Sequence, residues 1–466
     1  MHDSGALLFI FAHLSLGHII LVLALVMAVS GLDDLFVDLV FLGRAAWQRL
    51  GAANRQSRPD LATLRAVRAA PMAIIIPAWD EAAVIGAMLT RLLATLDYPA
   101  VRIFVGLYPN DPAGIDAVGS IDDPRLSRVI CSRPGPTTKA DCLNHLWRAL
   151  LADEVASGRR FAGVVLHDAE DVIHPDELWV QNGLMPGLAM VQLPVEPLPD
   201  AESRWVAGHY LDEFATGHIK DVMVRAALGA AVPSAGVACA IDRAMLGQIA
   251  DAAGGDPFDP SCLTEDYELG LKIKSLGGAT ALVRVRCADG VGVIATRENF
   301  PANFDSARRQ KTRWLLGIAL AGWDRLGWPG GIADRYMLAR DRKAVAAALT
   351  TLAAYVVALL AVIDAALLRW VFPDLVLPPL FGPLATALAL ANLALAIWRL
   401  AMRAACTRHI YGWAEGARAV PRALVSNVIN AAAAWSACRR YWIMLDGGGA
   451  LTWDKTAHRF PSSLAA

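Results

Sequence analysis

The stretch Gly163-Val164-Val165-Leu166-His167-Asp168-Ala169-Glu170 decides the fold, because a short apolar run leads into two alternating carboxylates. Runs of this kind are typical of buried strands in a parallel sheet, and the carboxyl ends of such strands hold the ligand-binding residues. Two earlier runs end in the same way, residues 73–76 at Pro77 and residues 103–107 shortly before Asp111. Segments with helical spacing separate the runs. We therefore expect an α/β domain with a mostly parallel sheet.

The composition favours a membrane protein. Hydrophobic residues make up 56% of the 466 residues and charged residues 19%, which departs from the soluble norm. Segments 4–32, 344–363 and 375–398 contain no charged side chain, and each is long enough to span a bilayer, which takes about 20 residues. A fourth segment, 423–438, is shorter and predicts an interfacial or re-entrant helix. The net charge of −1 argues against a nucleic-acid partner.

Basic residues follow the first predicted span and precede the second, and none precedes the first. By the positive-inside rule, this predicts an external amino terminus and a cytosolic α/β domain in a multi-pass membrane protein. We predict a transmembrane anchor (1–43), a basic cytosolic linker (44–70), the α/β domain (71–330), an amphipathic segment with two further spans (331–400) and a cytosolic or interfacial C-terminal segment (401–466).

Asp168 and Glu170 lie two residues apart at a predicted strand end, so their side chains can converge on one point. Carboxylates are the ligands that Mg²⁺ or Mn²⁺ prefer, and such a cation can offset the charge of a nucleotide diphosphate. An acidic pair is also common in ordinary loops and at helix starts. Both interpretations stay open from the residues alone.

Two helical stretches open on charged residues. Thr264-Glu265-Asp266 opens one of them, and a carboxylate there can act as the base that a transfer onto a hydroxyl requires. Thr264 before acidic residues is also an ordinary helix start, and the two roles are compatible. Lys139 opens the other stretch, where a cation is electrostatically misplaced unless it serves an anion. Phosphate contact and simple solvation both remain possible for Lys139.

Gln310-Lys311-Thr312-Arg313-Trp314 is the most specific pattern, because two uncommon residue types at fixed spacing seldom coincide by accident. Arg313 can bind a pyrophosphate through its planar guanidinium, and Trp314 can form a stacking wall for a sugar ring. The alternative is a membrane-proximal helix rich in basic and aromatic residues, since Arg308 and Arg309 lie close by.

Taken together, these motifs resemble glycosyltransferase family 2, the inverting GT-A enzymes that include cellulose and hyaluronan synthases. This resemblance covers about residues 70–320 and rests on residues 76–81, 139–144, 168–170, 264–266 and 310–314. More narrowly, nearly the whole chain resembles the inner-membrane bacteriophage-adsorption protein B family, which is tied to exopolysaccharide secretion. The segments that carry this second resemblance are 104–112, 167–171, 233–237 and 453–461.

The resemblance implies a role for each matching residue. Asp266 would be the general base, with Glu265 beside it, and Gly236 and Trp314 would lie at the acceptor. The metal would be held by Asp168 and by Glu170, although Glu departs from the family's D-x-D and leaves Asp171 as an alternative to Glu170. The nucleotide-sugar and its diphosphate would be bound by Pro77, Glu81, Asp111, Lys139, Asp168, Gln310, Arg313 and Trp314.

The resemblance implies transfer of a sugar from a nucleotide-sugar to a growing exopolysaccharide, with Mg²⁺ or Mn²⁺ as cofactor. A UDP-sugar is the favoured donor. One alternative is a single transfer to a lipid acceptor. Another is a catalytically inert membrane scaffold of a polysaccharide secretion or phage-adsorption system, against which the intact motif set argues. An outer-membrane secretion partner belongs to the same expectation, and regulation by cyclic di-GMP in cis is not expected.

Overall fold

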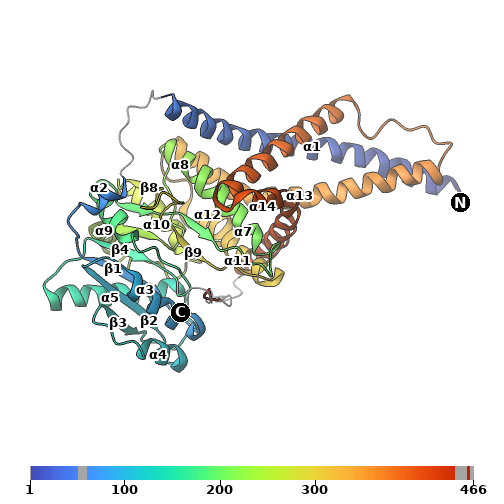
Figure 1. Cartoon of the computed structure of the whole chain (residues 1–466). Helices are drawn as coiled ribbons and strands as arrows, with labels where there is room; N and C mark the ends of the chain where they lie inside the picture. Colours follow the sequence, from blue (N-terminus) through green and yellow to red (C-terminus); the bar gives the residue numbers. More distant parts are fainter. Residues whose placement is uncertain (1, 51–59, 447–458, 462–466) are drawn as a thin grey trace.

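The computed structural model describes residues 2–50, 60–446 and 459–461. An α/β body holds the strands, and long helices extend away from it on one side (Figure 1). Arg55 and Arg58 of the predicted linker, and most of the 453–461 segment, lie outside the described residues.

The central sheet of the described chain has seven strands in the order β3-β2-β1-β4-β7-β5-β8. Neighbouring strands are parallel except that β7 runs antiparallel to both β4 and β5. The predicted mostly parallel sheet is confirmed, as are its three predicted strands. The strands are β1 (Met72–Pro77), β2 (Val101–Leu107), β3 (Leu126–Ile130), β4 (Gly163–Leu166), β5 (Met190–Gln192), β7 (Cys239–Asp242) and β8 (Thr280–Leu282).

Strand β1 shows how helices cover both faces of this sheet. Its alternate residues point to opposite faces, so Ile74 and Ile76 belong to one buried cluster and Ala73 and Ile75 to another. Helices α3 (Ala82–Thr95) and α6 (Glu177–Leu184) pack into the first cluster, and helices α5 (Lys139–Ser157), α9 (Arg243–Ala252) and α10 (Glu265–Ser275) pack into the second. The continuous apolar run follows from burial on both faces.

The described chain contains a second sheet and several shorter helices. A second sheet pairs β6 (Val195–Pro197) with β9 (Thr296–Glu298) in parallel. The remaining helices of the body are α2 (Leu61–Arg65), α4 (Pro112–Gly119), α7 (Gly208–Thr216), α8 (Val222–Ala227), α11 (Phe304–Leu315) and α12 (Ala321–Leu326), with a 3₁₀ turn η1 (Met185–Gly187) and π-helical turns η2 (Gly217–Asp221) and η3 (Leu316–Leu320).

Among the described residues, three helices are long and apolar enough to cross a membrane, namely α1 (His2–Arg49), α13 (Ile332–Trp370) and α14 (Pro383–Leu445). The third predicted span began too early, because residues 375–382 are not helical. Helix α14 starts at Pro383, where the missing N–H of proline costs no hydrogen bond. Residues 423–438 are not a separate short helix either: they follow a kink at Gly412, whose φ is 81°, within α14.

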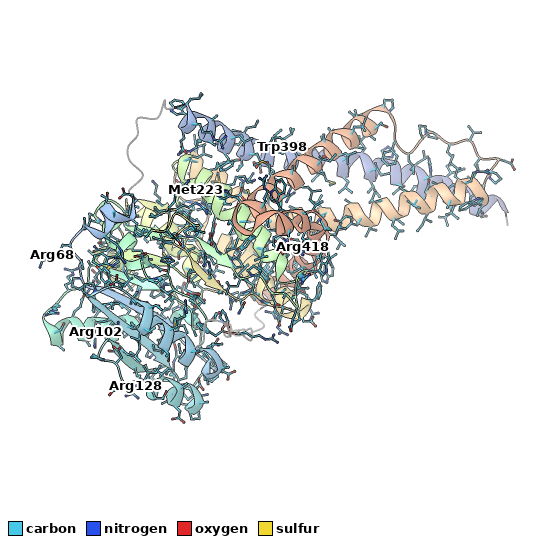
Figure 2. The ribbon with its side chains drawn as sticks, viewed as in Figure 1. Arg68, Arg102, Arg128, Met223, Trp398 and Arg418 are labelled. Atoms are coloured by element: carbon cyan, nitrogen blue, oxygen red, sulfur yellow. The ribbon has the colours of Figure 1, made fainter. Side chains whose placement is uncertain are left out.

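Helix α1 also extends beyond the predicted anchor, because Arg44 and Arg49, which lie in the predicted linker, are helical. The C-terminal half of α1 is tied to the other long helices by charge. Asp33 accepts from Tyr336 Oη at 2.6 Å and pairs with Arg340 of α13. Trp398 of α14 lies beside α1 (Figure 2), and its indole donates to a carboxylate of α1, Asp38 Oδ2, at 2.9 Å.

Candidate active site

Residues of all five predicted motifs line one cavity at the carboxyl edge of the sheet. Pro77 ends β1, the carboxylates after β4 come from the neighbouring strand, and α5 and α10 begin at the same edge. Helix α11 closes the other side. The predicted residues that line the cavity are Pro77, Glu81, Lys139, Asp168, Glu170, Glu265, Asp266, Gln310, Arg313 and Trp314. The fold thus brings together groups that are widely separated in the sequence.

Lys139 at the first position of α5 contacts a carboxylate across the cavity. Its Nζ lies 2.6 Å from Asp168 Oδ1. Burial acts against the charged ammonium, but the carboxylates of Asp168, Glu265 and Asp266 outweigh it and raise the pKa of Lys139 above its usual value. A cation at a helix start is therefore balanced here by three nearby anions, and it stays protonated at neutral pH.

Asp266 lies on the first turn of α10, where its Oδ1 accepts the backbone N–H of Tyr267 at 2.7 Å. Burial raises the pKa of Asp266, and Lys139 opposes this effect. Burial also raises the pKa of Glu265, with the adjacent Asp266 charge adding to it. A carboxylate whose pKa is raised towards neutrality takes up a proton more readily, as a general base must.

Gly236 lies against Asp266. Its φ of 81° is in the left-handed region, and a Cβ built on it would come well under 3.0 Å from Asp266 Oδ2. The absence of a side chain thus makes room for the carboxylate. Gly236 is not among the described residues that line the cavity, and it touches the cavity lining through Asp266.

The acidic motif after β4 divides into two parts. Glu170 lines the cavity with Asp168, whereas Asp171 turns into a buried network. Asp171 Oδ2 lies 2.6 Å from His167 Nδ1 and accepts Asp168 N–H at 3.1 Å, and His167 Nε2 lies 2.8 Å from Glu177. The geometry therefore favours Glu170 over Asp171 as the second candidate metal ligand.

The cavity carries a strong excess of negative charge. Among its described lining residues, the carboxylates of Glu81, Asp168, Glu170, Glu265, Asp266 and Glu298 face only the cations of Lys139 and Arg313. No group of three or more His, Cys, Asp or Glu side chains in the described chain is arranged to hold a metal. Two carboxylates suffice, however, when substrate phosphates complete the coordination shell, as is usual for Mg²⁺. The residues fit a divalent cation that binds together with a diphosphate.

Asp111, which the resemblance assigns to nucleotide binding, accepts hydrogen bonds from two backbone N–H groups. It is the N-cap of α4, where its carboxylate accepts Gly114 N–H at 3.0 Å and also Asp80 N–H at 2.9 Å. It is absent from the described residues that line the cavity. The local reason is the cap, which turns the carboxylate back onto its own loop.

Two buried polar atoms at the cavity have no hydrogen-bond partner within the described residues, Thr264 Oγ1 and Gln310 Oε1. Thr264 holds the N-cap position of α10, as the ordinary interpretation predicted, but its side chain makes no capping hydrogen bond. Buried polar groups are nearly always paired.

Sequence reasoning missed an aromatic wall of the cavity. Phe214 of α7 and Phe300 after β9 line it with Trp314. The ring centroids of Phe214 and Phe300 are 4.8 Å apart, and those of Phe214 and Trp314 are 6.4 Å apart. Both phenylalanines lie outside the motifs, and no periodic pattern marks them. Glu298, on the same segment as Phe300, was missed for the same reason.

Fold and site together define a GT-A protein with a glycosyltransferase domain. Residues 69–317 match the family described as Glycosyltransferase like family 2, and this match covers more than half of the chain. The chain belongs to that family. The resemblance predicted from its motifs is thereby confirmed.

Individual relatives agree with this assignment. Bacteriophage adsorption protein B of Escherichia coli strain K12 and Bacteriophage N4 adsorption protein B of Escherichia coli O157:H7 are each 37% identical over 471 residues, which cover 95% of this chain and 62% of the relative. The chain thus spans less than two thirds of their length. A solved mannosyltransferase from Pyrobaculum calidifontis, in complex with GDP-Man and Mn2+, has a TM-score of 0.51 at 17% identity and covers 87% of this chain and 99% of its own. This likeness concerns the fold.

Proposed function

We propose that the protein is a membrane-anchored inverting glycosyltransferase that transfers a sugar from a nucleotide-sugar to a growing exopolysaccharide. The observation that carries the proposal is the convergence of Lys139, Asp168, Asp266 and Arg313 on one cavity. The three helices long and apolar enough to cross a membrane support a membrane setting, and the GDP-Man and Mn2+ of the solved mannosyltransferase support a nucleotide-sugar and a divalent cation. A UDP-sugar is the first donor to test, followed by GDP-linked sugars.

Asp168 and Glu170 would hold Mg²⁺ or Mn²⁺, which supplies positive charge to the departing diphosphate when bound. Arg313 binds the same diphosphate through its guanidinium. Asp266 takes the proton from the attacking hydroxyl, and the excess of nearby carboxylates favours this uptake. Trp314 gives the acceptor sugar a flat apolar surface on which to stack.

The membrane arrangement extends the proposal. We place the amino terminus outside the inner membrane and the catalytic domain in the cytosol, following the distribution of basic residues. The part of α14 after Gly412 would lie at the cytosolic interface. Trp413, Trp435 and Trp442 are each at least two thirds exposed there, while Ile429 and Ala433 on the same helix are buried against the body.

A donor screen tests the proposal. Purified protein is titrated by calorimetry with UDP- and GDP-linked sugars in the presence of Mn²⁺, and saturable binding of at least one donor is expected. Failure of every donor to bind would favour the inert scaffold instead. Once a donor is known, sizing of the product separates the acceptors, because a ladder of long chains means polymer synthesis and a single addition means transfer to a lipid.

A further inference from the structure

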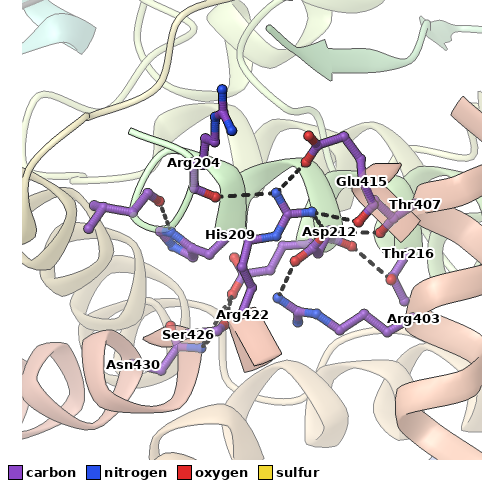
Figure 3. A network of polar contacts seen from close by, with 12 residues as sticks. Arg204, His209, Asp212, Thr216, Arg403, Thr407, Glu415, Arg422, Ser426 and Asn430 are labelled. Atoms are coloured by element: carbon purple, nitrogen blue, oxygen red, sulfur yellow. Dashed lines mark hydrogen bonds and ion pairs between the residues drawn. The ribbon is translucent and has the colours of Figure 1, made fainter. Parts of the chain in front are cut away.

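The carboxylate of Glu213, which does not line the cavity in the described chain, contacts side chains of two other helices. Glu213 of α7 pairs through Oε2 with the ammonium of Lys311 on α11. Its Oε1 accepts from Ser426 Oγ at 3.1 Å and from Asn430 Nδ2 at 3.3 Å, both on α14 beyond the kink. Ser426 and Asn430 lie together on that helix where it faces α7 (Figure 3). Glu213 is thus a junction between α7, α11 and the C-terminal helix.

Lys311 lies within the Gln310–Trp314 motif but does not line the cavity with its neighbours in the described chain. Its side chain is only 7% exposed, against 26% for Glu213. The ammonium sits 5.3 Å from the ring centroid of Tyr210 and 5.9 Å from that of Trp314. A cation at this distance from an aromatic face is attracted to it. The pair with Glu213 therefore fixes the ammonium against the indole that faces the acceptor side.

Opposite charges stabilise the pair of Glu213 and Lys311. Burial on its own would raise the pKa of Glu213, but Lys311, His209 and Arg403 lower it, so Glu213 stays ionised. Burial lowers the pKa of Lys311, and Glu213 opposes that effect. If the charge of Glu213 is removed, a buried ammonium loses its counter-ion, which a helix cannot tolerate without moving or releasing a proton.

Asp212, the residue before Glu213, anchors helix α7 to α14. Asp212 accepts from Arg422 at 2.7 Å, from Arg403 at 3.1 Å and from Thr407 at 3.0 Å (Figure 3). These partners lie on α14 on both sides of Gly412. The anchored α7 gives Glu213 a fixed position, from which it can hold the motif helix α11.

We propose that Glu213 is a positioning residue, which acts through Lys311 to set the place of Arg313 and Trp314 around the donor diphosphate and the acceptor. This inference rests on the proposed function of the cavity. It also makes the C-terminal helix part of the active site's support, because Ser426 and Asn430 orient the same carboxylate.

The first test compares Glu213→Gln with a matched control, Glu154→Gln. Glu154 pairs with Arg243 at 2.7 Å, both side chains are 11% exposed, and the pair joins α5 to α9 away from the cavity. Hydrogen exchange of the α11 amides is expected to speed up in Glu213→Gln and to match the wild type in Glu154→Gln. Equal α11 exchange in Glu213→Gln and the wild type would overturn the proposal, and this readout needs no donor.

The second test uses nucleotide affinity and a conservative rescue. With a donor from the screen and Mn²⁺, we expect Lys311→Met to weaken binding at least about tenfold, because small displacements of positioned groups are costly. Lys311→Arg retains the cation and should bind like the wild type. Unchanged affinity in Lys311→Met, or equal losses in both variants, would contradict a positioning role. If the wild type itself binds no donor, the proposed function fails, and α11 exchange still decides the role of Glu213.

Discussion

The cavity and the interface between α7 and α14 use charged groups in opposite ways. In the cavity, carboxylates outnumber cations and face an open space. At the interface, where Lys311 of α11 also takes part, the carboxylates of Asp212, Glu213 and Glu415 meet the cations of Arg403, Arg422 and Lys311 at close range, and the groups neutralise one another. Unbalanced charge is available to a ligand, whereas paired charge holds helices together. The comparison predicts that substitutions in the first region affect chemistry and those in the second affect stability and position.

The largest effect is expected for Asp266→Asn. The amide keeps the size of the side chain but cannot accept the acceptor's proton, so turnover should fall between about a hundredfold and ten-thousandfold. Turnover with a donor from the screen and binding of that donor by calorimetry measure the two consequences separately. Asp305→Asn is the control, since its carboxylate is 71% exposed on α11. Turnover near the wild-type level in Asp266→Asn would remove Asp266 from the role of base.

The second largest effect is a loss of stability, expected when Arg422 at the interface is replaced. Arg422 is fully buried and donates to Asp212 and Glu415, so Arg422→Met leaves the buried Asp212 and the partly buried Glu415 with fewer partners. We expect a loss of about 3 kcal/mol in the free energy of unfolding, as for other broken buried pairs. The measurement is thermal or denaturant unfolding in detergent.

Arg418→Met provides the matched comparison. Arg418 pairs with the same Glu415, but its side chain is 38% exposed. Its loss should cost less than about 1 kcal/mol, because exposed pairs contribute little. Equal losses in the two variants would show that burial does not distinguish these pairs, and the contrast between interface and surface would not hold.

The acidic motif after β4 contains both kinds of carboxylate side by side. Glu170→Gln should weaken Mn²⁺-dependent donor binding between about tenfold and a hundredfold, as expected when a metal ligand or its support is lost. Asp171→Asn should leave the Mn²⁺ response intact and lower the unfolding midpoint instead, because Asp171 pairs with buried His167. Donor titrations at several Mn²⁺ concentrations measure the first effect. The reverse pattern would make Asp171 the ligand.

The sequence predicted the cavity well because its determinants are local. An apolar run that ends in a polar residue identifies β1, β2 and β4, and parallel strands bring their ends to one edge. The paired interface leaves no such signal. Glu213 meets Lys311 across 98 positions and Asn430 across 217, so neither pairing produces a periodic pattern. The roles of the cavity residues remain predictions that the variants above test.

Some errors were local and have a physical cause. The start of α14 at Pro383 was missed because residues 375–382 are apolar yet contain prolines, which favour turns over a helix interior. Asp111 remains a prediction for the nucleotide site, but an aspartate before a proline and a glycine is also a good helix cap, and that is its observed contact. Apolar length and motif position do not reveal such competing uses.

The smallest effect is expected at Gly236, where backbone strain and contact with the cavity can be separated. Gly236→Ala places a Cβ in a left-handed conformation, which costs about 1 kcal/mol, and also presses it against Asp266. Gly254→Ala has the same strain, since its φ is 84°, but nothing lies within 4 Å of its Cβ. Gly236→Ala should lose more stability than Gly254→Ala because of this added contact, and only Gly236→Ala should also lose turnover. If turnover falls equally in both, strain alone explains the loss. Normal turnover in Gly236→Ala would instead mean that Asp266 has room to move without cost to catalysis.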